Sequence, residues 1–188
     1  SDAAMNDSIN NVGVGYQALS ALTTADNNTA IGKTAGKALT TGASNVVIGS
    51  TTLETATTVT QTVVIGTDAM SDVPAGQAVE GATAVGYEAF KGTASTTDGA
   101  NGTVAIGYAA GAAITTGGGN TLVGYASGDS ILTGANNTAL GRHSLGAANG
   151  SESNNTAIGF GALSAFTTNG TNRNTAVGAS ALGTAADG

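Results

Sequence analysis

The sequence predicts an all-β fold, a parallel β-solenoid (β-roll) of about ten coils, because one short motif repeats through most of the chain. The segment NNTAIG at Asn27–Gly32 returns as NNTALG at 136–141 and as NNTAIG at 154–159. The glycine that closes it recurs at steps of 17, 17, 17, 20, 21, 17, 17, 18 and 19 residues. A unit this short buries little by itself and must stack on its neighbours. We therefore divide the 188 residues into a lead-in or partial coil at 1–10 and a solenoid repeat domain at 11–188.

The composition excludes several classes of protein. Only 9% of the residues are charged, and a net charge of −7 with five basic residues leaves no surface for nucleic acid. The absence of Cys excludes disulfides and thiolate metal sites. The apolar runs are too short for membrane insertion by this segment, and we expect the chain to be a processed product or a piece of something longer.

The first element expected in each coil is a short strand that ends at the glycine. The residue directly before the glycine is aliphatic in every repeat, and the residue three places before the glycine is β-branched. The residue between them is usually small, as at Ala30, Ala84 and Ala139, so the strand has two different faces. The glycine itself fits a position that needs positive φ or close backbone contact. These repeat glycines are Gly15, Gly32, Gly49, Gly66, Gly86, Gly107, Gly124, Gly141, Gly159 and Gly178.

An asparagine column stands four places before the glycine. Asn suits turns and bonds to nearby backbone, and amides stacked about 4.8 Å apart can pair from coil to coil as a ladder. The column comprises Asn11, Asn28, Asn45, Asn120, Asn137, Asn155 and Asn174.

A second short strand is expected after the glycine. The residue three places after the glycine is always small, and the next residue is often Leu, Met or Phe. A Thr-Thr or Gly-rich polar turn then leads to the next coil, so that ten coils give a rod roughly 50 Å long. The longer steps place extra residues in that turn, on one edge of the rod. These insertions fall at about Ser71–Glu80, Lys91–Gly102, Ala147–Ser153 and Thr168–Arg173.

The repeat core N-[ST]-[VA]-A-[IVL]-G, with a small residue three places on, resembles the head repeats of trimeric autotransporter adhesins (YadA-like) and repeat regions of phage tail fibres. The resemblance covers about residues 11–187 and implies a homotrimer of parallel, left-handed β-rolls around a threefold axis. It implies a structural protein, extracellular on a virion or cell surface, which spaces or presents a receptor-binding surface for a host or surface glycan or receptor. The small-residue columns would let neighbouring chains approach, and burial between chains would supply the core that one chain lacks.

The sequence offers little catalytic chemistry. His143 is the only histidine, followed by Ser144 and preceded one coil earlier by Asp129, and we interpret it as a solvated surface residue. No pair of carboxylates shares a face, and neither a D-x-D-x-D-G loop nor a GGxGxD repeat is present. We predict no catalytic residue, no cofactor and no metal site, and therefore no enzyme.

Two further interpretations stay open. The tyrosine column after the glycine, at Tyr16, Tyr87, Tyr108 and Tyr125, is either a structural stack or a platform for sugars. The alternative to a fibre is a monomeric β-solenoid that binds a repetitive surface such as ice through rows of threonine. Thr-Thr pairs occur at 23–24, 40–41, 57–58, 115–116 and 167–168.

Overall fold

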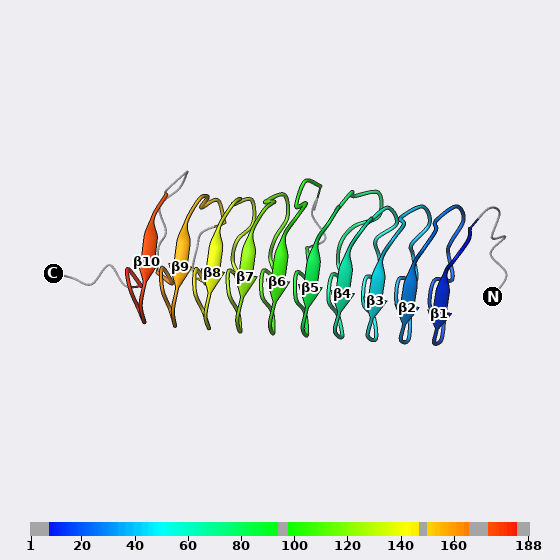
Figure 1. Cartoon of the computed structure of the whole chain (residues 1–188), viewed down its shortest axis with the longest axis horizontal. Helices are drawn as coiled ribbons and strands as arrows, with labels where there is room; N and C mark the ends of the chain where they lie inside the picture. The colour runs from blue at the N-terminus through cyan, green and yellow to red at the C-terminus, as the bar shows by residue number, and fades with distance from the viewer. Residues whose placement is uncertain (1–7, 94–97, 147–149, 166–172, 184–188) are drawn as a thin grey trace.

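A computed structural model, which describes residues 8–93, 98–146, 150–165 and 173–183, confirms the β-solenoid. In these residues ten three-residue strands form one parallel sheet in chain order, and the coils follow one another along a rod (Figure 1). These residues contain no helix, and hence none long and apolar enough to cross a membrane. The strands are β1 (Val12–Val14), β2 (Thr29–Ile31), β3 (Val46–Ile48), β4 (Val63–Ile65), β5 (Thr83–Val85), β6 (Val104–Ile106), β7 (Thr121–Val123), β8 (Thr138–Leu140), β9 (Thr156–Ile158) and β10 (Thr175–Val177).

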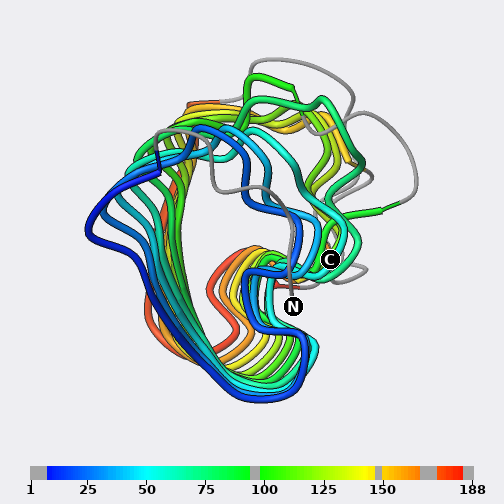
Figure 2. The same ribbon diagram turned by 90° about the vertical axis from the view of Figure 1, so that its right-hand side faces the viewer.

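The register follows the repeat glycines throughout. Each strand pairs with the next so that equivalent repeat positions lie opposite each other, as Ile31 opposite Ile48. The two longest steps do not disturb this pairing, since Val63 still meets Thr83 and Val85 still meets Ile106. Seen along the rod, the coils share one outline and are offset gradually from the N-terminal to the C-terminal coil (Figure 2).

The extra residues of the longer steps are taken up between strands, as expected. The insertion at Ser71–Glu80 lies in the connection from β4 to β5. Those at 91–102 and 147–153 are only partly described, because 94–97 and 147–149 fall outside the described residues. Of the insertion at 168–173, only Arg173 is described.

The expected second strand is wrong, because the chain turns sharply after the glycine. The residues two and four places after it have positive φ in every coil, for example Thr34 at 55° and Gly36 at 59°. Two such residues so close together prevent an extended strand. Backbone bonds between coils nevertheless continue through the turn: the Thr34 N–H donates to the Tyr16 carbonyl at 2.8 Å.

The small-residue columns fill the interior of the single chain. The middle residue of each strand from β2 to β10 is buried, and so are most of the small residues three places after the glycine, as at Ala35 and Ala162. The expectation that these columns let neighbouring chains approach is therefore wrong. The reason is the narrow coil, whose interior combines these small side chains with a few larger ones from the turns, such as Leu22, Leu53 and Phe90.

Side-chain volumes compensate between repeat positions in two coils that lack a large side chain four places after the glycine. Gly111 and Gly128 occupy the position that is usually Leu, Met or Phe, and Leu122 stands where most coils have Ala. A Cβ atom at Gly128 would lie 2.7 Å from the Leu122 Cδ2 atom, and one at Gly111 would lie 2.8 Å from its Cδ1 atom. The Leu122 side chain thus occupies the space that both glycines leave.

Candidate interaction surfaces

The repeat glycines have both of the properties that the sequence suggested, a positive φ angle and close contact with neighbouring backbone. Their φ angles lie between 126° and 140°. A Cβ atom at Gly141 would lie 2.6 Å from the Gly159 carbonyl oxygen in the next coil. Gly178 is the exception, because β10 is the last strand described and a Cβ atom there would meet nothing nearer than 3.9 Å. Glycine is therefore required by the stacking of coils as well as by the backbone conformation.

The asparagine ladder is confirmed and forms two runs. In the first run, the backbone N–H and Nδ2 of Asn45 donate to the Asn28 Oδ1 atom at 3.0 and 2.9 Å. In the second run, Asn155 donates to the Asn137 Oδ1 atom in the same way at 3.0 and 3.1 Å. Between the two runs the column is occupied by Thr62, Ala82 and Thr103. Amides in this column satisfy buried backbone groups, which would otherwise destabilise the stack.

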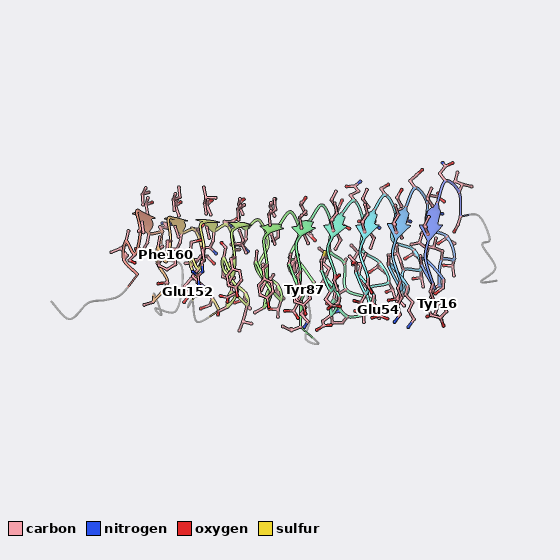
Figure 3. All side chains as sticks on the ribbon, turned by 90° about the horizontal axis from the view of Figure 1, so that it is seen from below. Tyr16, Glu54, Tyr87, Glu152 and Phe160 are labelled. Atoms are coloured by element: carbon pink, nitrogen blue, oxygen red, sulfur yellow. The ribbon has the colours of Figure 1, made fainter. Side chains whose placement is uncertain are left out.

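The outer sheet face consists of the first and third residues of every strand, which point away from the interior. Its members are Val, Thr, Ile or Leu in all ten strands, without a charged side chain. Val14, Ile106, Leu140 and Val177 are 54%, 38%, 48% and 66% exposed. In Figure 3 the side chains of this face project from the strands along the whole rod. Exposed aliphatic side chains that recur along ten coils form an apolar surface of a size that is unusual on monomeric soluble proteins.

The aromatic row is the column directly after the glycine in five consecutive coils: Tyr87, Tyr108, Tyr125, Arg142 and Phe160. The ring centroids of Tyr87 and Tyr108 lie 5.3 Å apart at 18°, and those of Tyr108 and Tyr125 lie 4.9 Å apart at 7°. The labelled Tyr16, Tyr87 and Phe160 follow the length of the rod (Figure 3). Because the rings of Tyr87, Tyr108 and Tyr125 cover each other's faces, a structural stack describes these three tyrosines better than a platform for sugars does. Tyr16 is separated from them by Lys33, Ser50 and Thr67 in the same column.

Arg142 continues the row in place of an aromatic ring. Its Cζ atom lies 5.6 Å from the centroid of the Tyr125 ring and 5.7 Å from that of Phe160, so the guanidinium group is held between two rings. Among the described residues, this guanidinium group makes no hydrogen bond and no ion pair. The sequence indicated the aromatic residues of this column, and Arg142 was missed although it follows the repeat glycine Gly141 directly and therefore belongs to the same column.

His143, Ser144 and Asp129 do not converge as a catalytic group. The His143 ring packs edge-on against Tyr125 at 5.4 Å. The Ser144 hydroxyl points into the buried interior and donates to the Gly141 carbonyl at 2.9 Å. Burial raises the pKa of the Asp129 carboxyl, while the nearby His143 opposes that shift. The repeat position of Ser144 explains its burial without a catalytic role.

Charged side chains gather in small groups on the turn that follows the strands. The Lys91 Nζ atom bonds to the Glu88 Oε1 atom at 2.9 Å, and this bond raises the pKa of Lys91. The same Glu88 carboxylate raises the pKa of the Tyr87 phenol beside it. Lys37 pairs with Glu54 at 3.5 Å. Exposed pairs of this kind contribute little to stability, so they do not hold the rod together.

The Thr-Thr turns use several of their hydroxyl groups within the chain. The Thr23 Oγ1 atom donates to the Thr40 carbonyl at 3.0 Å, and the Thr40 Oγ1 atom donates to the Thr57 carbonyl at 3.2 Å. Thr115 repeats the pattern on the Leu132 carbonyl at 2.8 Å. These hydroxyls bridge successive coils, so the turns stabilise the stack and offer a poor basis for binding ice. The pair at 167–168 lies outside the described residues.

Comparison with known proteins adds no assignment. No protein-family model matches the chain, and neither a curated protein nor a solved structure matches it. Within the described part of the chain, no group of three or more His, Asp or Glu side chains could hold a metal ion. The surfaces of the rod itself are therefore the features from which a function can be argued.

Proposed function

We propose that the chain is a segment of an extracellular structural rod, a virion tail fibre or a cell-surface adhesin. In this proposal it works as a homotrimer and spaces or presents a receptor-binding surface. The observation that carries the proposal is the outer sheet face, which has an aliphatic residue at the third strand position in all ten coils and is uncovered in the single chain.

The face suits association with copies of the same chain. Each strand contributes the same two outward positions, so chains that run parallel and in register bring like columns together at every coil. Removal of apolar surface from water stabilises an assembly by about 25 cal/mol per Å² of buried area. Because the outer sheet face runs the length of the rod, the area that association could bury increases with every coil. Because each chain has one such face, a closed arrangement around an axis parallel to the rod buries all copies equally. The resemblance to adhesin and fibre repeats supplies the number three.

The experiment measures the molar mass in solution by light scattering after size exclusion. The native chain should elute as an elongated species with the mass of three chains. Ile106→Asp with Leu140→Asp places carboxylates on the outer sheet face and should give monomers, because burying unpaired charges is unfavourable. Leu132→Asp is the matched control: Leu132 is an exposed aliphatic residue in a turn, away from this face, and its variant should keep the native mass. A native chain that is monomeric at every concentration would rule out the proposal.

Binding to a repetitive surface such as ice is the second candidate, and one observation favours it. The first residue of β7, β8, β9 and β10 is Thr, as it is in β2 and β5, so the outer sheet face carries an unbroken row of hydroxyl groups over its last four strands. This candidate needs the face to stay free in a monomer, whereas the rod needs it covered. Thermal hysteresis in a freezing assay, measured on a chain shown to be monomeric, would support the second candidate.

A further inference from the structure

We infer that Arg142 and Phe160 form a binding site for the carboxylate of an acidic sugar chain on the side of the rod. This inference rests on the proposed presenting role and names the class of ligand that would be recognised. It arises from the one position where the aromatic row holds a cation between two rings.

The first argument is that the Arg142 guanidinium group is oriented in advance. Rings on both sides, at 5.6 and 5.7 Å from its Cζ atom, restrict the plane of the group. A guanidinium group stacked in this way keeps its N–H edge available for a planar, two-oxygen acceptor. Since less side-chain entropy is lost on binding, such an arginine binds a carboxylate better than a free one does.

The second argument is charge. Of the five basic residues, Lys37 and Lys91 are paired with carboxylates, whereas Lys33, Arg142 and Arg173 form no ion pair with a described residue. Arg142 differs from the other two because it is held between two rings. The side chain is exposed, and the protein around it carries a net charge of −7. An uncompensated guanidinium group held in place on such a surface is an attractive site for one anionic group.

The third argument concerns the uncovered face of Phe160. Arg142 lies over one face of this ring, and the next position of the row is Ala179, whose side chain is only a methyl group. Phe160 is 53% exposed, so the stack of rings ends here with apolar surface in water. A pyranose ring has an apolar C–H face that packs on an aromatic ring, and in a chain of uronic acids the neighbouring unit carries a carboxylate that would reach Arg142 past the edge of the Phe160 ring. An acidic sugar chain lying along the row would thus supply both partners.

The test is calorimetric titration with a short oligogalacturonate, at about 0.15 M salt so that long-range attraction is screened. The fully methyl-esterified oligomer is the neutral match, and hexaglutamate and inorganic phosphate are the other anions. The oligogalacturonate should bind, and the ester, the peptide and phosphate should bind at least roughly tenfold more weakly, the scale of one charged hydrogen bond. Equal binding of hexaglutamate or phosphate would overturn the sugar assignment, and failure of the oligogalacturonate to bind would overturn the site.

Variants locate the site. Arg142→Gln and Arg142→Lys should both weaken binding about tenfold or more, because lysine keeps the charge and loses the planar fork. Phe160→Leu should weaken it severalfold, and Arg173→Gln, which removes an arginine from the turn before β10, should leave it unchanged. Equal effects of Arg173→Gln and Arg142→Gln, or native binding by Arg142→Lys, would overturn the inference. The mass of each variant separates the two proposals: a trimer that does not bind contradicts only this site, and a monomer that binds contradicts only the self-association.

Discussion

Replacement of repeat glycines by alanine tests how tightly the coils are stacked. Gly141, Gly159 and Gly178 have similar φ angles of 134°, 126° and 128°, so alanine strains the backbone equally at each. At Gly141 and at Gly159 the new methyl group would lie 2.6 Å from the carbonyl oxygen of the next repeat glycine. At Gly178 it would meet nothing nearer than 3.9 Å. The three substitutions therefore differ in the clash between coils and share the local strain.

The expected magnitudes follow from these two contributions. Backbone strain at such a φ costs on the order of 1–3 kcal/mol at all three positions. The clash at Gly141 adds about 1–3 kcal/mol of overpacking. It also strains the bonds from the Gly159 N–H to the Leu140 carbonyl and from the Gly161 N–H to the Arg142 carbonyl, worth about 1 kcal/mol each. We expect roughly 3–6 kcal/mol for Gly141→Ala and about 1–3 kcal/mol for Gly178→Ala.

The assay is urea unfolding followed by far-ultraviolet circular dichroism, with native-state hydrogen exchange to resolve individual coils. Gly159→Ala controls for position, because it lies one coil from Gly178 and yet has the clash. If Gly159→Ala behaves like Gly141→Ala, stacking is responsible; if it behaves like Gly178→Ala, fraying of the last coils explains the difference. Equal destabilisation by all three substitutions would show that φ alone demands glycine and would refute the argument from close approach.

Three other predictions concern the interior. Asn137→Ala should destabilise the fold by about 3–5 kcal/mol in urea unfolding, because it leaves several buried donors and acceptors without hydrogen-bond partners. The control Asn136→Gly should change stability by less than roughly 0.5 kcal/mol, because Asn136 is exposed and already has a positive φ. Gly128→Ala should destabilise the fold by about 2–4 kcal/mol, because a Cβ atom at Gly128 competes for space with the Leu122 methyl groups. In a double-mutant cycle, Leu122→Ala should therefore remove part of that cost, and additive effects of the two substitutions would contradict this packing. Burial raises the pKa of Asp129, so its ionised form destabilises the fold at neutral pH; Asp129→Asn should raise the midpoint of thermal unfolding at about pH 7 and lose that gain near about pH 3.

The strand positions, register and asparagine ladder could be predicted because they depend on neighbours that repeat in the sequence. A β-branched residue, a small residue, an aliphatic residue and a glycine, repeated at nearly constant spacing, fix both the strand and its pairing, as Ile31 opposite Ile48 shows. Amides at the same repeat position must meet once the coils stack. Such features need only the period, and the period is visible in the chain.

The direction of the strand faces and the shape of the turn could not be predicted in the same way. A rule that larger apolar residues go inside would bury Ile106 and expose Ala105, and the structure does the reverse because the coil is narrow. Leu53 and Phe90 follow the pattern of a strand, yet both have positive φ, which such side chains seldom adopt. There the tertiary demand to close a thin coil overrides local preference. Arg142 was missed because its ring neighbours belong to other coils.

The arrangement of the columns indicates where specificity for a partner resides. Side chains in the columns that point inward, such as Ala157 and Asn155, must pack against or hydrogen-bond to the next coil. Their identity is therefore set by the fold and says nothing about a ligand. The third strand position on the outer sheet face does not contact the interior and is nevertheless aliphatic in every coil. This constancy fits a partner that repeats with the same period, such as another copy of the chain. The aromatic row also lies outside the interior, and it changes from coil to coil, with Arg142 at a single place. A partner recognised at one point along the rod must therefore use the columns that vary, because the constant ones look alike at every coil.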